Sequence, residues 1–299
     1  MQKATANGIE IAYESFGDEN APVFLMIMGM GVQMLYWPDE LCENLAARGF
    51  RVIRYDNRDV GGSTRFDQAG FLTAAEIGGA MMRGEAPKTA YSLEDMAADA
   101  IGLLDALGIE RAHIVGDSMG GIIAQLIAIH YPDRTLSLTS MMSTSGNPSL
   151  PRSSPEAGAA LNSVAPDPAE DLEAFIQHWI KVHRAIGGRY QESEDKIRRT
   201  MTKVAERGYD AGGVMRHLAA AAVGTTDKRE ALRKLDVPAL VVHGSDDPLI
   251  PVAAAEDTAA NIPGAELVIV EGVGHDFPDE SIEPIVNALA SLSERAARA

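Results

Sequence analysis

Short apolar runs that alternate with amphipathic segments are the feature that most constrains the fold of this chain. Each run is rich in Val, Ile, Leu and Met, as expected of a strand buried on both faces. The segments between the runs have the apolar spacing of helices and end at glycine or proline. The runs lie at residues 23–28, 51–56, 112–117, 136–142, 238–244 and 266–272. This alternation predicts an α/β fold with a mostly parallel central sheet flanked by helices.

Local signals place the ends of several elements. Asn7-Gly8 precedes an alternating apolar pattern, which predicts a β-hairpin at the start of the domain. A helical pattern begins near Pro38, and Ser92 has the features of an N-cap with acidic residues in the following turn. Residues 57–91 are irregular, and their pattern leaves both a short helix and a mobile flap open.

The alternation of strands and helices breaks between two of the apolar runs. Residues 145–232 contain helical patterns, clearest at 167–186 and 195–207, and no convincing strand. We therefore expect a helical cap at 145–232, inserted into an α/β core made of residues 1–144 and 233–299. A cap in this position is expected to cover the site and to set substrate choice.

Composition limits the partners and the compartment. The chain has 299 residues, a formal net charge of −17 and one cysteine. Such acidity disfavours binding to nucleic acid or anionic membranes, which are recognised through Lys and Arg clusters. A single cysteine allows no intrachain disulfide and no cysteine-based metal site. We expect a soluble, cytoplasmic protein that acts on a small molecule; the pattern does not indicate its oligomeric state.

The segment "HIVGDSMGG" (113–121) carries the strongest chemical signal. Gly116-x-Ser118-x-Gly120 matches a nucleophile elbow, and the strand before it and the helix after it are the context that motif needs. A turn this tight forces Ser118 into strained backbone angles and leaves no room for side chains at the two glycines. Ser118 is therefore the expected nucleophile, with the free amide of Met119 stabilising negative charge at the helix N-terminus.

A serine hydroxyl needs a base to remove its proton, and seven histidines are candidates. His275 lies in the glycine-rich loop "EGVGHDFP" after the last apolar run, where it can reach back over the sheet edge to Ser118. His113 lies inside a buried run, and His243 ends another. We expect His275 to be the base.

An acid should orient the imidazole and stabilise its charged form. The segment "HGSDDPLIP" (243–251) offers Asp246 and Asp247 just after a buried run. With either one, the order along the chain is Ser, Asp, His, as in α/β-hydrolases.

These motifs together resemble the α/β-hydrolase-fold serine hydrolases over nearly the whole chain outside the cap. The resemblance is carried by "MGMG" (28–31), "YDNRDVGGS" (55–63), "GDSMGG" (116–121), "HGSDDPLIP" and "GVGHDFP". Within that fold the chain resembles small carboxyl- and methylesterases of the aclacinomycin methylesterase type. The resemblance implies hydrolysis of carboxylic esters or lactones through an acyl-enzyme, without cofactor or metal.

The resemblance also assigns the second oxyanion donor and the acid. Relatives use a backbone amide in the turn after the first core strand, which corresponds here to Met30. They place the acid three residues after the strand-ending glycine, which leads to Asp247, and Pro248 restricts the angles of that residue. The chain departs from the pattern at Met28, which replaces a histidine, and at Asp59, which replaces a glycine.

A substrate pocket is expected around these groups. Residues near the turn and on one face of the cap helix are the candidates for its lining: Gly29, Met34, Trp37, Phe175 and Trp179. Methionines in this region suit an adaptable apolar pocket.

Three other functions remain compatible with the motifs. A cofactor-free haloperoxidase or perhydrolase uses the same triad, and a carbon–carbon hydrolase does so too, because the triad does not encode the bond broken. A non-catalytic ligand-binding protein of the same fold is the alternative outside enzymes. Turnover of a generic ester separates the last from the others.

Overall fold

The computed structural model of the protein describes residues 1–298, and within them eight strands form one sheet. The strand order is β1-β2-β4-β3-β5-β6-β7-β8. The first two strands are antiparallel to their neighbours, and the other six run parallel. The strands are β1 (Gln2–Ala6), β2 (Ile9–Phe16), β3 (Val23–Ile27), β4 (Arg51–Tyr55), β5 (Ala112–Asp117), β6 (Thr135–Met141), β7 (Ala239–Gly244) and β8 (Glu266–Val270). The predicted mostly parallel sheet is confirmed, with strand ends within two residues of those expected.

The opening hairpin forms as predicted. Asn7 and Gly8 connect β1 to β2 with φ angles of 48° and 78°. Two successive positive φ angles define the turn that matches the twist of a two-residue hairpin, and Asn-Gly is the pair that adopts it most easily.

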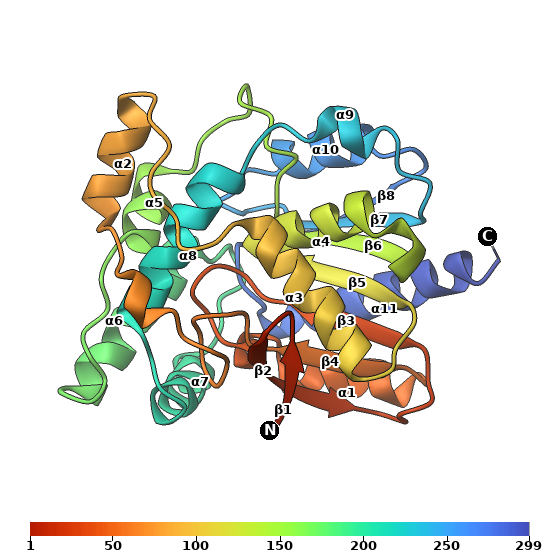
Figure 1. The fold of residues 1–299 in the computed structure, drawn as a ribbon, viewed down its shortest axis with the longest axis horizontal. Helices are drawn as coiled ribbons and strands as arrows, with labels where there is room; N and C mark the ends of the chain where they lie inside the picture. Colours follow the sequence, from red (N-terminus) through yellow and green to blue (C-terminus); the bar gives the residue numbers. More distant parts are fainter. Residues whose placement is uncertain (299) are drawn as a thin grey trace.

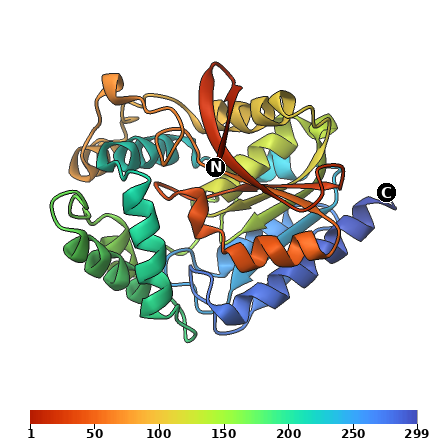
Figure 2. The same cartoon turned by 90° about the horizontal axis from the view of Figure 1, so that it is seen from below.

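Helices cover both faces of the sheet. Helices α3 (Leu93–Ala106) and α4 (Met119–His130) pack together on one face, and α1 (Asp39–Ala47) and α11 (Asp279–Ala296) pack together on the other (Figure 2). Helix α10 (Ala253–Ala260) connects β7 to β8. Ser92 caps α3 as expected, in a reciprocal capping box with Asp95.

Strand β3 is apolar at every position because it contributes to two cores. Leu25 and Ile27 belong to the core under α3 and α4, whereas Phe24 and Met26 belong to the core under α1 and α11. All four side chains are buried. Side chains alternate between the faces of a strand, so helices on both sides of the sheet bury the side chains that point to either face.

Between β6 and β7, in residues 142–238, which the structure describes in full, the chain forms helices and no strand. These helices are α5 (Pro155–Leu161), α6 (Leu172–Ile186), α7 (Glu194–Glu206), α8 (Ala211–Gly224) and α9 (Arg229–Leu232). Helices α5 to α8 gather beyond one end of the sheet, at the left of Figure 1. Phe175, Ile176 and Met201 are buried in a separate apolar cluster there. The division at residues 145 and 232 stays a prediction.

Residues 57–91 contain a short helix, one of the two alternatives left open by the sequence. Helix α2 (Ala74–Met82) begins with a capping box between Thr73 and Glu76 and packs against α8. Single 3₁₀ turns lie at Met34–Tyr36, Asp67–Ala69 and Pro132–Arg134. Within residues 1–298, no helix is both long and apolar enough to cross a membrane.

Candidate active site

The strand order defines where a ligand can bind. The chain places β4 on one side of β3 and β5 on the other. Where the order reverses in this way, the loops after the two central strands diverge and leave a crevice at the carboxyl ends of the strands. The turn after β3 and the turn after β5, which carries Ser118, both lie at this point.

Ser118 stands on a strained turn between β5 and α4. Its φ and ψ are 53° and −119°, a conformation that non-glycine residues rarely adopt. Its amide donates to the carbonyl of Met141, and its carbonyl accepts from Ser143 Oγ at 2.7 Å. These contacts fix the backbone of the turn.

Close backbone approach explains both elbow glycines. A Cβ atom at Gly116 would lie 1.9 Å from the carbonyl oxygen of Gly120. A Cβ atom at Gly120 would lie 2.1 Å from the carbonyl oxygen of Ile27, at the end of β3. The clash that the sequence predicts at these two positions is confirmed.

The turn after β3 lies directly against Ser118. A Cβ atom at Gly29 would be 3.2 Å from the Cβ atom of Ser118. The turn is held on both sides of Met30: Asn57 Nδ2 donates to the carbonyl of Met28 at 2.9 Å, and the amide of Gly31 donates to His217 Nδ1 at 2.9 Å. The backbone around Met30 is therefore fixed next to the serine.

Met119 is the first residue of α4 and is 3% exposed. The first amides of a helix have no partner within the helix and carry the positive end of its dipole. The amides of Met119 and Met30 thus belong to two backbone segments that meet at Ser118.

His275 is paired with Asp247, as expected. His275 Nδ1 lies 2.8 Å from Asp247 Oδ2. The other oxygen of Asp247 accepts from the amides of Leu249 and Ile250 at 2.8 and 2.9 Å. A second histidine, His243, places Nε2 3.2 Å from Asp247 Oδ2 and 2.7 Å from the carbonyl of Ile250.

This pairing changes the protonation of both groups. Burial alone would raise the pKa of Asp247, but the charges of His275 and His243 and their hydrogen bonds hold it well below its usual range. Burial alone would lower the pKa of His275, but the charge and hydrogen bond of Asp247 raise it to about 9. Asp247 is therefore ionised and favours the charged form of the imidazole.

Asp246 is turned away from the histidine. Its carboxylate accepts from Ser245 Oγ at 2.7 Å and from the amide of Arg189 at 3.3 Å, and it is exposed. The expectation that the two adjacent acids point in different directions agrees with these contacts.

Ser118 and His275 line one cavity of about 780 Å³. Met30, Met119 and Gly29 also line the cavity, together with residues of α6, α7 and α8. Trp179 of α6 contributes from the cap side, as expected.

Three of the residues expected to line the pocket do not reach it. Met34 and Trp37 are fully buried in the core, where the Trp37 ring packs on Phe277 at 5.3 Å between centroids. Phe175 is fully buried inside the cap, where its ring packs on Tyr209 at 5.0 Å. Packing turns the Trp37 side chain into the core under α1 and α11. It turns the Phe175 side chain into the separate apolar cluster that contains Ile176 and Met201.

Several polar residues of the cavity were not expected from the motifs. Asp276, Glu192 and His183 line it. His183 lies on the same face of α6 as Trp179, four residues away. Burial, and then the charge of Glu192, raises the pKa of Asp276 to about 7. Its position next to His275 was the signal available in the sequence.

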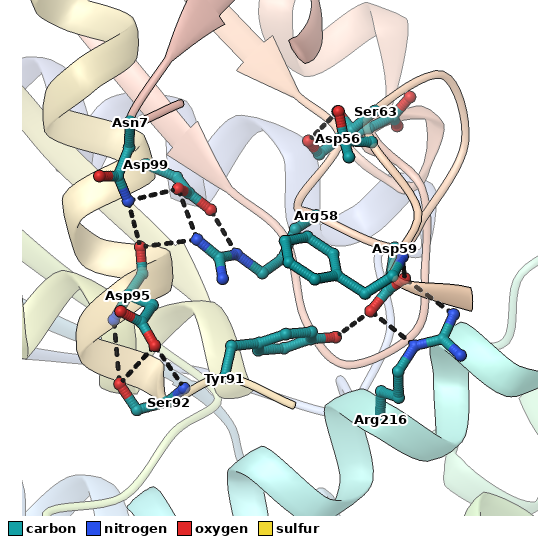
Figure 3. Close-up of polar contacts among 12 residues, drawn as sticks. Asn7, Asp56, Arg58, Asp59, Ser63, Tyr91, Ser92, Asp95, Asp99 and Arg216 are labelled. Atoms are coloured by element: carbon teal, nitrogen blue, oxygen red, sulfur yellow. Dashed lines mark hydrogen bonds and ion pairs between the residues drawn. The ribbon is translucent and has the colours of Figure 1, made fainter. Parts of the chain in front are cut away.

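The departure at Asp59 has a structural reason. Its φ is 70°, which explains why glycine suits this position in relatives. The buried carboxylate accepts two hydrogen bonds from Arg216 of α8, both at 2.8 Å, and one from Tyr91 at 2.5 Å (Figure 3). Asp59 thus fixes helix α8 to the loop after β4.

The same loop is anchored to the core by Arg58. Its guanidinium donates to both oxygens of Asp99 in α3 at 2.6 and 2.7 Å, and both side chains are buried (Figure 3). Asp56 accepts from the amides of Met34 and Gly62 at 2.9 Å. The loop that braces the turn at Met30 is thus tied to the core and to the cap.

The comparisons with known proteins agree with this architecture. Residues 22–281 match the family model described as the alpha/beta hydrolase fold, and the chain belongs to this family. Rhodomycin D methylesterase DauP from Streptomyces sp. (strain C5) is 29% identical over 98% of this chain and 97% of its own length.

Two other relatives carry different activities in their names. A 2-hydroxy-6-oxononadienedioate/2-hydroxy-6-oxononatrienedioate hydrolase from Cupriavidus pinatubonensis is 27% identical over 85% of this chain and 81% of its own length. The crystal structure of the enol-lactonase from Burkholderia xenovorans LB400 superimposes with a TM-score of 0.67 and 23% identity, covering 97% of this chain and 99% of that one. The last likeness bears on the fold alone.

Proposed function

We propose that this protein hydrolyses carboxylic esters through an acyl-enzyme formed on Ser118, with His275 as the base and Asp247 as its orienting acid. The observation that supports this most directly is the placement of a serine with positive φ in the same cavity as a histidine 2.8 Å from a buried aspartate. The similarity to a methylesterase over 98% of the chain favours an ester as the substrate.

In the first half of the reaction, Ser118 Oγ attacks the ester carbonyl carbon while His275 Nε2 accepts the hydroxyl proton. The electron pair of the carbonyl bond moves to its oxygen, and the amides of Met30 and Met119 donate to the resulting oxyanion. When the tetrahedral intermediate collapses, His275 returns the proton to the departing alcohol. Asp247 stabilises the imidazolium between these two transfers.

In the second half, water replaces the alcohol. His275 accepts a proton from water as the water oxygen attacks the acyl carbon, and the same two amides receive the oxyanion. Collapse returns the proton to Ser118 and releases the carboxylic acid. The sum is one ester and one water converted to one acid and one alcohol.

The size of the cavity favours a bulky substrate. A volume of about 780 Å³ is in the range that encloses a drug-sized ligand rather than an acetyl group alone. We expect methyl esters or lactones of large acids, with the cap helices setting the choice among them. The cytoplasmic location expected from the composition belongs to the same proposal.

Replacement of serines in the cavity tests the assignment. Ser118→Ala should abolish turnover of a short p-nitrophenyl ester while the protein remains folded by circular dichroism. Ser153→Ala, which changes another serine of the cavity lining, is the matched control and should retain activity. Full activity in Ser118→Ala would contradict the proposal.

A carbon–carbon hydrolase is the second candidate, because the relative from Cupriavidus covers 85% of the chain. Loss of absorbance from a 2-hydroxy-6-oxo-dienoate, without turnover of any methyl ester, would favour it. Peroxide-dependent activity is tested in the same assay by adding hydrogen peroxide and an acceptor.

A further inference from the structure

In the part of the chain that the structure describes, four side chains of the cavity carry buried polar atoms without a hydrogen-bond partner: one is Asp117, through Oδ1, and the other three are Asp276, His183 and Trp179. Within residues 1–298, no partner meets either carboxyl oxygen of Asp276, Nε2 of His183 or Nε1 of Trp179, although all these atoms are buried. All three residues line the cavity that contains Ser118 and His275. Buried polar groups are nearly always paired, and an unpaired one lowers stability, so such a cluster needs an explanation.

Asp276 is held in place by backbone contacts rather than by partners of its own. It is 5% exposed and follows His275, whose amide donates to the carbonyl of Ile186 at the end of α6 at 2.8 Å. A Cβ atom at Gly187 would lie 3.2 Å from Asp276 Oδ2, so the carboxyl group lies against this glycine. The amide of Gly187 already donates to the carbonyl of His183. The nearby backbone therefore leaves the acid unsatisfied.

The neighbouring charges are matched with one another and do not serve Asp276. Glu192 lies 3.1 Å from His183 Nδ1 and 3.2 Å from Lys196 Nζ. Lys196 also pairs with Asp279 at 3.0 Å and donates to the carbonyl of Phe277. Asp247 is paired with His275. Unlike Glu192, Asp279 and Asp247, Asp276 forms no ion pair within residues 1–298; Asp117, which has one unpaired oxygen, is the other buried carboxyl group of the cavity without an ion pair there.

His183 lies beside Glu192 and against two aromatic rings. Glu192 Oε2 is 3.1 Å from Nδ1, an ion-pair contact, but neither ring nitrogen forms a hydrogen bond within residues 1–298. The His183 ring stacks on Tyr36 with 6.0 Å between centroids and 19° between planes, and the Trp179 ring packs edge-on against the same Tyr36 ring. Both side chains are therefore fixed by aromatic packing, with Nε2 of His183 able to accept a hydrogen bond and Nε1–H of Trp179 able only to donate one.

We propose that Asp276, together with Nε2 of His183, forms a subsite that recognises a hydrogen-bond donor on the ester substrate, and most strongly a protonated amine, with the Nε1–H of Trp179 left to donate to an acceptor oxygen of the same substrate. An ammonium group supplies several donors and the missing positive charge, and charge-assisted hydrogen bonds are roughly twice as strong as neutral ones. An apolar cavity with one convergent polar cluster is the usual design of a selective ligand site. This assignment deepens the proposed ester hydrolysis and rests on it.

Matched methyl esters test the subsite. Wild-type protein is assayed with methyl hexanoate and methyl octanoate and with their ω-amino and ω-hydroxy derivatives. We expect kcat/KM for an amino ester to exceed that of its unsubstituted counterpart by about tenfold or more, the usual effect of a hydrogen bond to a charged group. Asp276→Asn should remove most of this ratio, because it keeps the shape and loses the charge.

Two controls make the result specific. Glu40→Gln removes an exposed carboxylate at the mouth of the same cavity and should keep the ratio. Because Asp276 forms no hydrogen bond, Asp276→Asn should also unfold at the same temperature as wild type or higher, which separates a lost contact from misfolding. An equal ratio in wild type and Asp276→Asn, or no preference for any amino ester, would overturn the subsite.

Binding without turnover separates this inference from the proposed function. Hexylamine and hexanol are titrated into Ser118→Ala by calorimetry, where catalysis plays no part. Tighter binding of hexylamine that Asp276→Asn abolishes supports the subsite even if no ester is hydrolysed. Equal binding of both probes contradicts the subsite even if esters are hydrolysed.

Discussion

Asp246 and Asp247 are adjacent and chemically identical, but their surroundings give them different tasks. Asp247 is buried between two histidines and two backbone amides, whereas Asp246 is exposed and bonds Ser245 and Arg189. The turn after β7 directs the two carboxyl groups to different partners. The two neighbouring carboxyl groups therefore differ in burial and in hydrogen-bond partners.

Replacing each acid by its amide measures that distinction. Asp247→Asn should lower kcat on the order of ten-thousand-fold, as in a serine protease, because the amide favours the wrong imidazole tautomer. Asp246→Asn should retain most of the activity. Circular dichroism of both variants checks the fold, and equal losses would show that the two acids act as a pair.

The protonation of His275 predicts the pH dependence. As the base it must be unprotonated, so kcat/KM rises with pH through the pKa of His275 in the free enzyme. Asp247 raises that pKa, and Asp117 and Asp276 act in the same direction. The acid limb should therefore lie above the pH expected for an ordinary histidine, near 6.5.

Removing the charge of Asp247 should move this limb. The residual activity of Asp247→Asn should have its acid limb at lower pH than that of wild type, because the neutral amide no longer favours the imidazolium. The measurement is kcat/KM against pH for both proteins. A limb that stays at the same pH would mean that another group controls it.

At the scale of elements, helix α8 contacts the turn after β3, which carries Met30. Arg216 of this helix pairs with Asp59, and His217 accepts from the amide of Gly31 and contacts the carbonyl of Arg58 at 2.7 Å. One turn of α8 thus contacts both the loop after β4 and the turn that carries Met30. Substitutions in this helix should therefore alter the position of the turn that carries Met30.

Loss of the Arg216 side chain tests this connection. Arg216→Met leaves the buried carboxylate of Asp59 without its charge partner, and breaking a buried pair costs about 3–5 kcal/mol of unfolding free energy. The measurement is denaturant unfolding. Arg198→Met breaks an exposed pair with Glu173 and should have an effect near the error of the measurement. Similar losses in both would contradict a special role for Asp59.

The cap should also control selectivity through Trp179, which lines the cavity. Trp179→Ala enlarges the cavity and should raise the rate on long acyl esters relative to short ones, by about tenfold for a hydrophobic contact of this size. Phe175→Leu, inside the cap core, should lower stability and leave that ratio unchanged. The measurement is kcat/KM across a series of acyl lengths, and a Trp179 variant without a changed ratio would contradict the role of the cap.

At the scale of the whole molecule, much of the fold could be predicted because its signals are local. The parallel strands are rich in apolar residues over short runs, and Asn7-Gly8 and Ser92 have the turn and cap preferences of their own residue types. The pairing of His275 with Asp247 could be predicted because parallel strands place their following loops at one edge.

What could not be predicted depends on packing between distant segments. Trp37 and Phe175 have the right residue types and neighbourhood for a pocket, but their direction is set by Phe277 and by Tyr209. Asp59 looks like an isolated departure until Arg216, far along the chain, is brought to it. No local pattern contains these contacts.

The central claim is that Ser118 becomes acylated. The most direct measurement treats the protein with a serine-directed fluorophosphonate and maps the modified residue by peptide mass spectrometry. We expect one labelled residue, Ser118, with labelling lost in Ser118→Ala and slowed strongly in Asp247→Asn. Labelling of a different serine, or hydrolysis that continues in fully labelled protein, would contradict it.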